Sequence, residues 1–372
     1  MKPHLDPHLR LGILGGGQLA WMLALKSQSL GLRTSILCPS SEEPAAQVNP
    51  NWMKGDPNQV PDLEGFAKSQ DLMTFESEFY EGENLQQGLR HFKGLLFPRL
   101  QVLTTLQDRL SQKESLTQAR LSTSPFLSST SPLEIQNFLR KHQALVAKQR
   151  RHGYDGYGTF VLKTEKELAA FLNAHEGELT KFIFEKWIPF QKELAFQVAR
   201  SRAGDLQFFP LVETIQKDKK CFYVVGPEKP PQAVMAKIGK WLDRLNYVGV
   251  MGVEFFKTGN ELMINEIAPR VHNTGHHTLD SCTVDQFTMH WLCALQDELP
   301  RPELKVPAFV MLNLLGESDR PVQFPEQIEG SLYWYRKSNR AGRKLGHINW
   351  VGKSKRALVH KALSHLKDWK LR

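Results

Sequence analysis

A hairpin predicted around residue 260 places two glutamates opposite each other. Residues 249–256 (GVMGVEFF) and 261–267 (ELMINEI) have the apolar, β-branched composition of strands, and a turn separates them. Glu254 and Glu266 are equally distant from Asn260, so they should face each other across the two strands. Facing carboxylates among apolar neighbours destabilise a sheet unless a cation lies between them. The pair therefore predicts a Mg²⁺ site, because Mg²⁺ takes oxygen ligands and usually binds phosphates as well.

The alternative for these acids is a solvated strand face that holds two unrelated carboxylates. The next segment, residues 268–276 (APRVHNTGH), favours a site over that alternative. It follows the hairpin directly and holds a cation, two imidazoles and small polar side chains without a hydrophobic period. A loop that only connects two elements seldom needs such a set.

The N-terminal region predicts an α/β domain. Residues 11–14 form a short apolar strand, followed by a glycine turn at residues 15–20 (GGGQLA) and a helix. This arrangement presents backbone N–H groups to a phosphate, or it is merely a tight structural turn. The next strand, residues 34–37, ends in Cys38 rather than in the acid that NAD binding requires, which argues against a dehydrogenase.

Another strand of this domain, residues 71–75, delivers Glu76 and Glu78 at its carboxyl end. Ligands of open α/β sheets bind at such ends, although a solvated strand end is the alternative. Farther along, residues 132–142 predict a helix and residues 144–148 a strand.

A glycine-rich loop follows this strand, at residues 149–159 (QRRHGYDGYGT). Glycines let a backbone approach phosphate oxygens closely. A plain hairpin would explain the glycines but not the neighbouring cations Lys148, Arg150 and Arg151. We therefore interpret the loop as a cover over a triphosphate.

Composition limits the classes of protein that fit. Hydrophobic residues make up 41% and charged residues 23% of the 372 residues, as in an ordinary globular protein of two or three domains. No apolar run has the length of a membrane helix or the position of a signal peptide, and the four cysteines have no disulfide spacing, so we expect a cytoplasmic protein. The net charge of +9 is spread along the chain, which favours an anionic small substrate over nucleic acid.

In their order along the chain, these motifs resemble the ATP-grasp carboxylase-ligases, and among them the N5-carboxyaminoimidazole ribonucleotide synthetases of purine synthesis. The resemblance covers nearly the whole chain and depends on four stretches: residues 12–19 (GILGGGQL), 150–158 (RRHGYDGYG), 265–276 (NEIAPRVHNTGH) and 342–349 (GRKLGHIN). The first is weak alone, whereas the others in this order are specific.

The resemblance implies an ATP-grasp fold with a Rossmann-like N-terminal domain of parallel sheet and a small β-rich C-terminal domain. The implied boundaries are residues 1–105 for the N-terminal domain, 106–185 and 186–300 for the small and large ATP-grasp subdomains, and 301–372 for the C-terminal unit. The implied reaction converts bicarbonate and ATP to carboxyphosphate, whose CO₂ is captured by the amine of 5-aminoimidazole ribonucleotide. ADP and phosphate leave, and the family analogy implies a homodimer.

The resemblance also implies roles for individual residues. Arg270, Lys148 and Asp155 would be catalytic, and Glu254 and Glu266 would hold Mg²⁺ or Mn²⁺. The nucleotide would contact Arg109, Lys148, Gly153, Tyr154, Asp155, Gly156, Tyr157, Gly158, Thr159, Glu185, Lys186, Trp187, Ile188, Glu193, Asn265 and Glu266. The ribonucleotide would contact Gln18, Glu76, Tyr154, Asp155, His272 and Asn273, with its 5′-phosphate on Lys337, Arg343 and Lys344.

Several positions depart from the family pattern. Ala20 and Trp21 replace a Gly-Arg pair, His152 replaces a glycine before the loop, and Gln216 replaces a histidine. None of these departures removes a metal ligand or a phosphate-binding cation. We therefore expect them to change the affinity for the substrate more than the ATP chemistry. The rival interpretations are a related ATP-grasp enzyme, such as a formate-dependent glycinamide ribonucleotide transformylase or a biotin-carboxylase-like protein, and a catalytically silent nucleotide- or RNA-binding protein.

Overall fold

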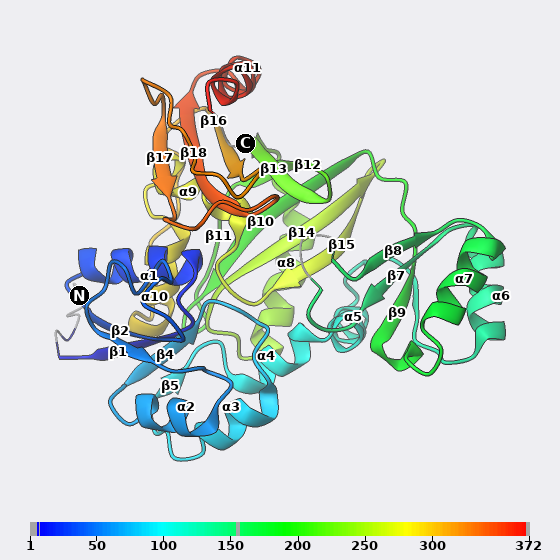
Figure 1. Ribbon diagram of the computed structural model, residues 1–372, viewed down its shortest axis with the longest axis horizontal. Coiled ribbons are helices and arrows are strands. Elements are labelled where there is room, and N and C mark those ends of the chain that lie inside the picture. The colour runs from blue at the N-terminus through cyan, green and yellow to red at the C-terminus, as the bar shows by residue number, and fades with distance from the viewer. Residues whose placement is uncertain (1–5, 7, 154–156, 370–372) are drawn as a thin grey trace.

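The computed structural model describes residues 6, 8–153 and 157–369, and its strands form three sheets. Figure 1 shows the N-terminal sheet at the lower left and a small sheet with α6 and α7 at the right. A large central sheet lies between them, and the C-terminal strands lie above. The chain is therefore mixed α/β, as its sequence predicts.

The N-terminal sheet is parallel, with the strand order β3-β2-β1-β4-β5. Its core strands β1 and β4 are almost entirely buried, which explains their continuous apolar sequences. The strands are β1 (Arg10–Leu14), β2 (Arg33–Cys38), β3 (Trp52–Lys54), β4 (Leu72–Phe75) and β5 (Leu95–Leu96). The helices of this region are α1 (Gln18–Ser29), α2 (Val60–Ala67), α3 (Gly82–Gly88) and α4 (Leu100–Gln107).

The small sheet is antiparallel, in the order β6-β9-β7-β8. Two capped helices accompany it: Ser131 caps α6 and Thr164 forms a capping box with Glu167 at α7. The elements are β6 (Phe126–Leu127), α6 (Pro132–His142), β7 (Leu145–Gln149), β8 (Thr159–Leu162), α7 (Glu165–Ala174) and β9 (Phe182–Lys186). The preceding helix α5 (Arg109–Gln118) packs its Leu116 in the core of the central sheet. The sequence predicted α6 with its observed bounds.

The central sheet is antiparallel and runs in the order β15-β14-β10-β12-β13-β16-β18-β17, with β11 paired to β10. Its first part holds β10 (Lys192–Arg200), β11 (Leu206–Phe208), β12 (Leu211–Lys217), β13 (Lys220–Glu228), α8 (Gln232–Arg244), β14 (Gly249–Thr258), β15 (Glu261–Ala268) and α10 (Gln286–Leu295). The C-terminal elements are β16 (Ala308–Leu315), β17 (Ser331–Trp334), β18 (Lys344–Gly352) and α11 (Lys355–Leu366). Because β13 pairs with β16, the C-terminal strands continue the central sheet.

A helix of the central region ties it to the N-terminal domain. Trp291 of α10 is fully buried and donates its indole N–H to the carbonyl of Leu23 in α1 at 2.9 Å. Thr74 of β4 also bonds His290 of α10, at 2.7 Å. These contacts hold the carboxyl ends of the N-terminal strands next to the central sheet.

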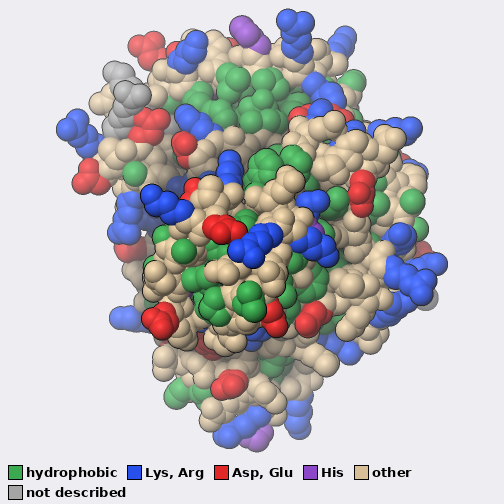
Figure 2. Space-filling view, turned by 90° about the vertical axis from the view of Figure 1, so that its right-hand side faces the viewer, with side chains coloured by type: hydrophobic (Ala, Val, Ile, Leu, Met, Phe, Trp, Pro, Cys, Tyr) green, Lys and Arg blue, Asp and Glu red, His purple; other side chains and the backbone are tan. Residues whose placement is uncertain are grey.

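The distribution of charged side chains on one face helps to identify the class of partner. On the face that carries α6 and α7, Lys and Arg side chains are scattered among acidic ones (Figure 2). Such scatter is unlike the continuous basic face of nucleic-acid-binding proteins. In the described part of the chain, no helix combines the length and apolarity needed to cross a membrane.

Candidate active site

A cleft of about 630 Å³ opens between the three sheets. Most of the predicted site residues line it: Gln18, Arg109, Lys148, Thr159, Glu185, Lys186, Trp187, Ile188, Glu193, Glu254, Asn265, Glu266, Arg270, His272, Asn273 and Lys344. The fold thus gathers side chains that are up to 326 positions apart, from Gln18 to Lys344.

The facing glutamates lie on β14 and β15, and Glu254 is the register partner of Glu266, as predicted. The structure produces this pairing in a different way from the count around Asn260. Thr258 pairs with Glu261, so the turn has two residues, and the register then shifts by one between Glu254 and Phe255. Asn265 is the extra residue of this bulge. A bulge re-aims side chains, and here both Asn265 and Glu266 line the cleft.

Both carboxylates face cationic or imidazole groups. Arg109 forms an ion pair with Glu266 at 3.0 Å, and Nε2 of His272 lies 3.8 Å from Glu254. The side chains of Glu254 and Glu266 are 23% and 41% exposed, so they are less buried than the apolar neighbours in the sequence indicate. Two partly open carboxylates suit a hydrated cation that also binds phosphate oxygens.

Lys148 belongs to a buried charged cluster. Its ammonium donates to Glu185 at 3.2 Å and to the side-chain oxygen of Asn265 at 3.1 Å. The same Glu185 oxygen accepts from Ser124 at 2.7 Å and pairs with Lys113 at 3.2 Å. Burial by itself raises the pKa of Glu185, but Lys148 and Lys113 outweigh it and lower that pKa to about 2. Glu185 therefore holds Lys148 in place at the cleft wall.

The walls beside this cluster are largely apolar. Val146, Val161, Trp187, Ile188 and Phe256 line the cleft together, and Phe256 stacks on Phe190 at 4.6 Å between ring centroids. Glu193 lies at the edge, where burial raises its pKa and a hydrogen bond from Gln216 partly offsets that rise. Apolar walls with an acid beside them suit a purine base and its ribose hydroxyls.

Arg270 is bound by a carboxylate of the N-terminal domain. Its guanidinium forms a two-point pair with Glu78, through Nε and through Nη2 at 2.8 Å. Burial alone would lower the pKa of Arg270, but the charge and hydrogen bonds of Glu78 raise it. The sequence indicated Glu78 only as an acid at the end of a strand, because its partner Arg270 is 192 positions away.

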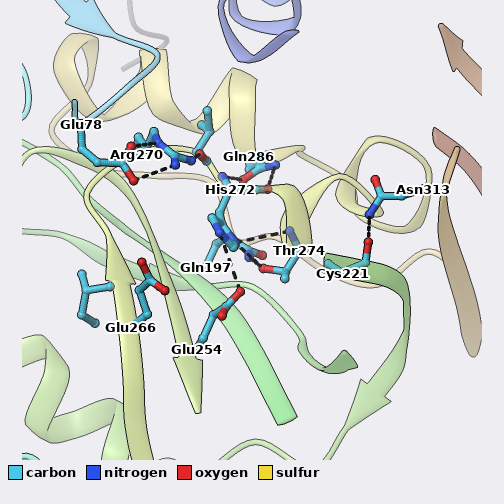
Figure 3. A network of polar contacts seen from close by, with 12 residues as sticks. Glu78, Gln197, Cys221, Glu254, Glu266, Arg270, His272, Thr274, Gln286 and Asn313 are labelled. Carbon is cyan, nitrogen blue, oxygen red and sulfur yellow. Dashed lines mark hydrogen bonds and ion pairs between the residues drawn. The ribbon is translucent and has the colours of Figure 1, made fainter. Parts of the chain in front are cut away.

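His272 lies between Arg270 and Glu254 (Figure 3). Burial, and then the charges of Arg270 and Lys344, lower the pKa of His272 well below its ordinary value. The next residue, Asn273, has a buried side-chain amide that lines the cleft, and its nitrogen and oxygen contact no partner among the described residues. A buried amide without partners is costly, so it points to a ligand contact.

The far end of the cleft, at Gln18, adjoins Glu76 and Lys337. Lys337 donates to the side chain of Gln18, and Glu76 accepts from the backbone N–H groups of Gly17 at 2.5 Å and Ala20 at 3.2 Å. The first turn of α1 is therefore occupied by a carboxylate. Of the two interpretations of the glycine turn, this geometry favours the structural one.

Other predicted residues lie elsewhere. Gly153, Tyr157, Gly158, Glu76, Lys337 and Arg343 are described but do not line the cleft itself. Gly153 accepts a hydrogen bond from Arg109 at 3.3 Å, and Arg343 donates to the hydroxyl of Ser338 at 2.6 Å. Tyr154, Asp155 and Gly156 are outside the described residues. The sequence did not indicate that Phe79 and Lys219 line the cleft. It also did not indicate that Lys113, which looked like an ordinary helix lysine, pairs with Glu185.

Known families match three stretches of the chain. Residues 9–107 match the ribonucleotide synthetase preATP-grasp domain, and residues 114–287 match the ATP-grasp domain. Residues 309–361 match the phosphoribosylaminoimidazole carboxylase C-terminal domain. The first match covers the N-terminal sheet. The second covers the small sheet and strands β10 to β15 of the central sheet, and the third covers most of the C-terminal strands.

Similar proteins cover nearly the whole chain. The N5-carboxyaminoimidazole ribonucleotide synthase of Synechococcus elongatus is 37% identical over 92% of this chain and 90% of its own length. The crystal structure of the Thermus thermophilus synthetase superposes with a TM-score of 0.86 at 33% identity, covering 96% of this chain and 97% of that chain. An Aspergillus clavatus synthase in complex with ADP and 5-aminoimidazole ribonucleotide superposes with a TM-score of 0.82 at 25% identity, covering 97% and 98%.

Proposed function

Because the chain belongs to the N5-carboxyaminoimidazole ribonucleotide synthases, we propose that the residues of its cleft carry out their reaction. The enzyme is an ATP-dependent ligase of purine biosynthesis. It converts 5-aminoimidazole ribonucleotide and bicarbonate to N5-carboxyaminoimidazole ribonucleotide, and ATP to ADP and phosphate.

The observation that carries the proposal is one cleft holding the paired Glu254 and Glu266, the anchored Lys148, and Lys344. Phosphoryl transfer depends mostly on positioning and on neutralising oxygen charge. The lysines and the facing acidic pair of this cleft meet both needs.

At the nucleotide end, the base would lie between Trp187, Ile188 and Lys186, with the ribose hydroxyls on Glu193. Lys148 and Arg109 would contact the phosphates, because Lys148 is directed by Glu185 and Arg109 lies beside Glu266. Glu254 and Glu266, with Asn265 beside them, would hold Mg²⁺, or Mn²⁺ in its place, which neutralises phosphate oxygens when it is bound. The loop residues 153–159 would cover the phosphates.

In the middle of the cleft, the γ-phosphoryl group passes from ATP to a bicarbonate oxygen. Arg270 would stabilise the negative charge on this group, because its guanidinium is held in place by Glu78 and faces the cleft. Carboxyphosphate then breaks into CO₂ and phosphate, so the site must exclude water until the substrate amine captures the CO₂.

At the other end, the ribonucleotide would contact Gln18, Glu76, His272 and Asn273. The partnerless amide of Asn273 supports a direct contact. Lys337, Arg343 and Lys344 would bind the 5′-phosphate, a role for which a forked guanidinium beside an ammonium is suited. Tyr154 and Asp155 would complete this end, with Asp155 in a catalytic role.

The test is ADP release in bicarbonate buffer with and without 5-aminoimidazole ribonucleotide. We expect turnover that requires the ribonucleotide. Turnover that instead requires glycinamide ribonucleotide and formate would contradict the proposal in favour of a transformylase, and tight, salt-sensitive RNA binding without turnover would contradict it in favour of a nucleic-acid-binding protein.

We also propose a cytoplasmic homodimer. The four cysteines, all described by the structure, form no disulfide, which supports a reducing compartment. Family analogy supports the dimer. Light scattering on the purified chain tests the dimer, and a monomer at assay concentration would contradict it.

A further inference from the structure

The segment of chain that carries Lys337 packs on a helix of the N-terminal domain. In Figure 1, β17 lies above α1, and the segment that leaves β17 begins with Tyr335. Tyr335 is 1% exposed and packs in the same apolar core as residues of α1. The ring of Trp21, in α1, meets the Tyr335 ring edge to face, with 5.9 Å between the ring centroids. This geometry is favourable for aromatic pairs, so the contact ties the two domains together at this point.

Lys337 is held by the same two elements. Its ammonium group lies over the Tyr335 ring, 5.9 Å from the ring centroid, which is within the range of a cation–π interaction. The ammonium group also donates a hydrogen bond to the side chain of Gln18. Gln18 and Trp21 are three positions apart in α1, so they lie on the same face of the helix. One face of α1 therefore holds Lys337 directly through Gln18 and indirectly through Trp21 and Tyr335.

Tyr335 is also fixed by strand β18. Its hydroxyl bonds Nδ1 of the buried His347 at 2.6 Å, and its backbone N–H donates to the carbonyl of Leu345 at 2.9 Å. Arg336, the next residue, has a φ of 56°, in the left-handed region that residues other than glycine seldom adopt. A segment in this conformation is kept there by its surroundings, so the position of Lys337 depends on the contacts of Tyr335.

The charges around Lys337 suit an ammonium group that is held for an anion. Arg343 and Lys344 repel its charge, whereas Glu76 and Glu43 attract it. Burial has the largest influence and lowers the pKa of Lys337 to about 8. A cation that is poorly hydrated interacts more strongly with an anion than a fully hydrated cation does.

Trp21 has no role among those assigned so far, although it is one of the positions at which the chain departs from the family pattern. As a partly buried side chain it could serve only as filling for the N-terminal core. Its contact with the ring that supports Lys337 favours a second role, at the ribonucleotide end of the cleft.

We propose that Trp21 is a positioning residue for the ribonucleotide: it supports Tyr335, which holds the Lys337 ammonium group where the 5′-phosphate binds. The inference rests on the proposed function for the identity of the ligand. Trp21 belongs to the N-terminal domain and Lys337 to the C-terminal region, so this phosphate site is complete only when the two are packed together.

NMR of the full chain labelled with ¹³Cε-lysine tests the position of Lys337 without any ligand. The signal missing from Lys337→Arg identifies Lys337, and its chemical shift as a function of pH gives the pKa. We expect a pKa of about 8 in the wild type and of about 9 or higher in Trp21→Ala, because an ammonium group released from Tyr335 becomes hydrated. An unchanged pKa in Trp21→Ala would overturn the inference whether or not the enzyme turns over.

Kinetics at about pH 7, where Lys337 is mostly charged, test the consequence for binding. In Trp21→Ala we expect the KM for the ribonucleotide to rise about threefold, the usual worth of one cation–π contact, with kcat and the KM for ATP unchanged. The matched control is Trp52→Ala, because Trp52 of β3 is another tryptophan that is partly buried against the same core. The control should lower the free energy of unfolding and leave the KM for the ribonucleotide unchanged. An equal rise of that KM in both variants would overturn the positioning role.

If Trp21→Ala does not fold, Trp21→Phe and Trp21→Leu provide the comparison. Phenylalanine keeps an aromatic edge on Tyr335, whereas leucine keeps only apolar volume. We therefore expect the KM for the ribonucleotide to be about threefold higher in Trp21→Leu than in Trp21→Phe. Equal values in the two variants would overturn the inference.

Lys337→Met separates this inference from the proposed function. If Lys337→Met leaves the KM for the ribonucleotide unchanged, the 5′-phosphate does not bind Lys337, and the proposed function is contradicted at that end of the cleft. If Lys337→Met raises this KM while Trp21→Ala does not, the proposed function stands and only the positioning role of Trp21 is wrong.

Discussion

The two ends of the cleft are built differently. At the nucleotide end, Lys148 and Lys113 both pair with one oxygen of Glu185, so each ammonium group has a carboxylate partner before any ligand binds. At the ribonucleotide end, Lys337 donates to the neutral Gln18 and lies over the ring of Tyr335, and the nearby Glu76 accepts from backbone N–H groups. The first end is preorganised, whereas the second keeps positive charge available for a phosphate.

Substituting each of the two lysines that pair with Glu185 should separate stability from turnover at the nucleotide end. We expect these substitutions to have the largest effects. Lys113→Met leaves Glu185 with a single ammonium, so we expect the free energy of unfolding to fall by roughly 3 kcal/mol. Lys148→Met should instead lower turnover on the order of 100-fold with a smaller loss of stability, because Lys148 faces the cleft. Urea unfolding and ADP release measure both. If Lys148→Met costs the greater stability and Lys113→Met the greater turnover, the division of roles is wrong.

Arg343→Ala tests the second end. We expect the KM for the ribonucleotide to rise about tenfold, the usual worth of one charged hydrogen bond, while the KM for ATP stays constant. Arg340→Ala is the matched control, because Arg340 is an exposed arginine three positions away on the same loop. A similar rise in both KM values, or an equal effect of the control, would argue against a phosphate pocket there.

A smaller effect should appear with pH. Burial lowers the pKa of Lys337 to about 8, although Glu76 opposes the shift. In the free enzyme Lys337 therefore loses its charge above about pH 8, and the KM for the ribonucleotide should rise by less than the roughly tenfold expected for Arg343→Ala. The folded chain binds this proton less well than the unfolded chain, so the same group makes the fold more stable as the pH rises from about 8 to 10.5.

Lys337→Arg is the control for this titration, because arginine keeps its charge throughout the range. Its KM for the ribonucleotide should stay constant between roughly pH 8 and pH 9.5. A wild-type rise that persists in Lys337→Arg would assign the titration to another group.

Local patterns in the sequence predicted the parts of the fold that local physics determines. The helix at residues 132–142 has its observed bounds because Ser131 caps it and its apolar side chains recur at helical spacing. The acidic pairing was also predicted, although by a count that omitted the bulge at Asn265 and used a longer turn. The two differences cancelled, so the correct pair came from an incomplete argument.

Pairings between distant residues could not be predicted. Nothing near Lys113 indicates that it will be buried against Glu185, 72 positions away, and nothing near Glu78 indicates Arg270. The glycine turn of α1 was ambiguous for the same reason, because the carboxylate that occupies it comes from the end of β4. These contacts depend on how the sheets are placed together.

In the proposed site, Glu254 and Glu266 together hold the divalent cation that binds the nucleotide phosphates. We would measure Mn²⁺ binding by electron paramagnetic resonance in the presence of a non-hydrolysable ATP analogue. We predict that Glu254→Gln and Glu266→Gln each weaken binding by at least about tenfold, whereas Glu261→Gln, an exposed acid of β15 that bonds Ser122, leaves it unchanged. Wild-type affinity in both cleft variants would contradict the account.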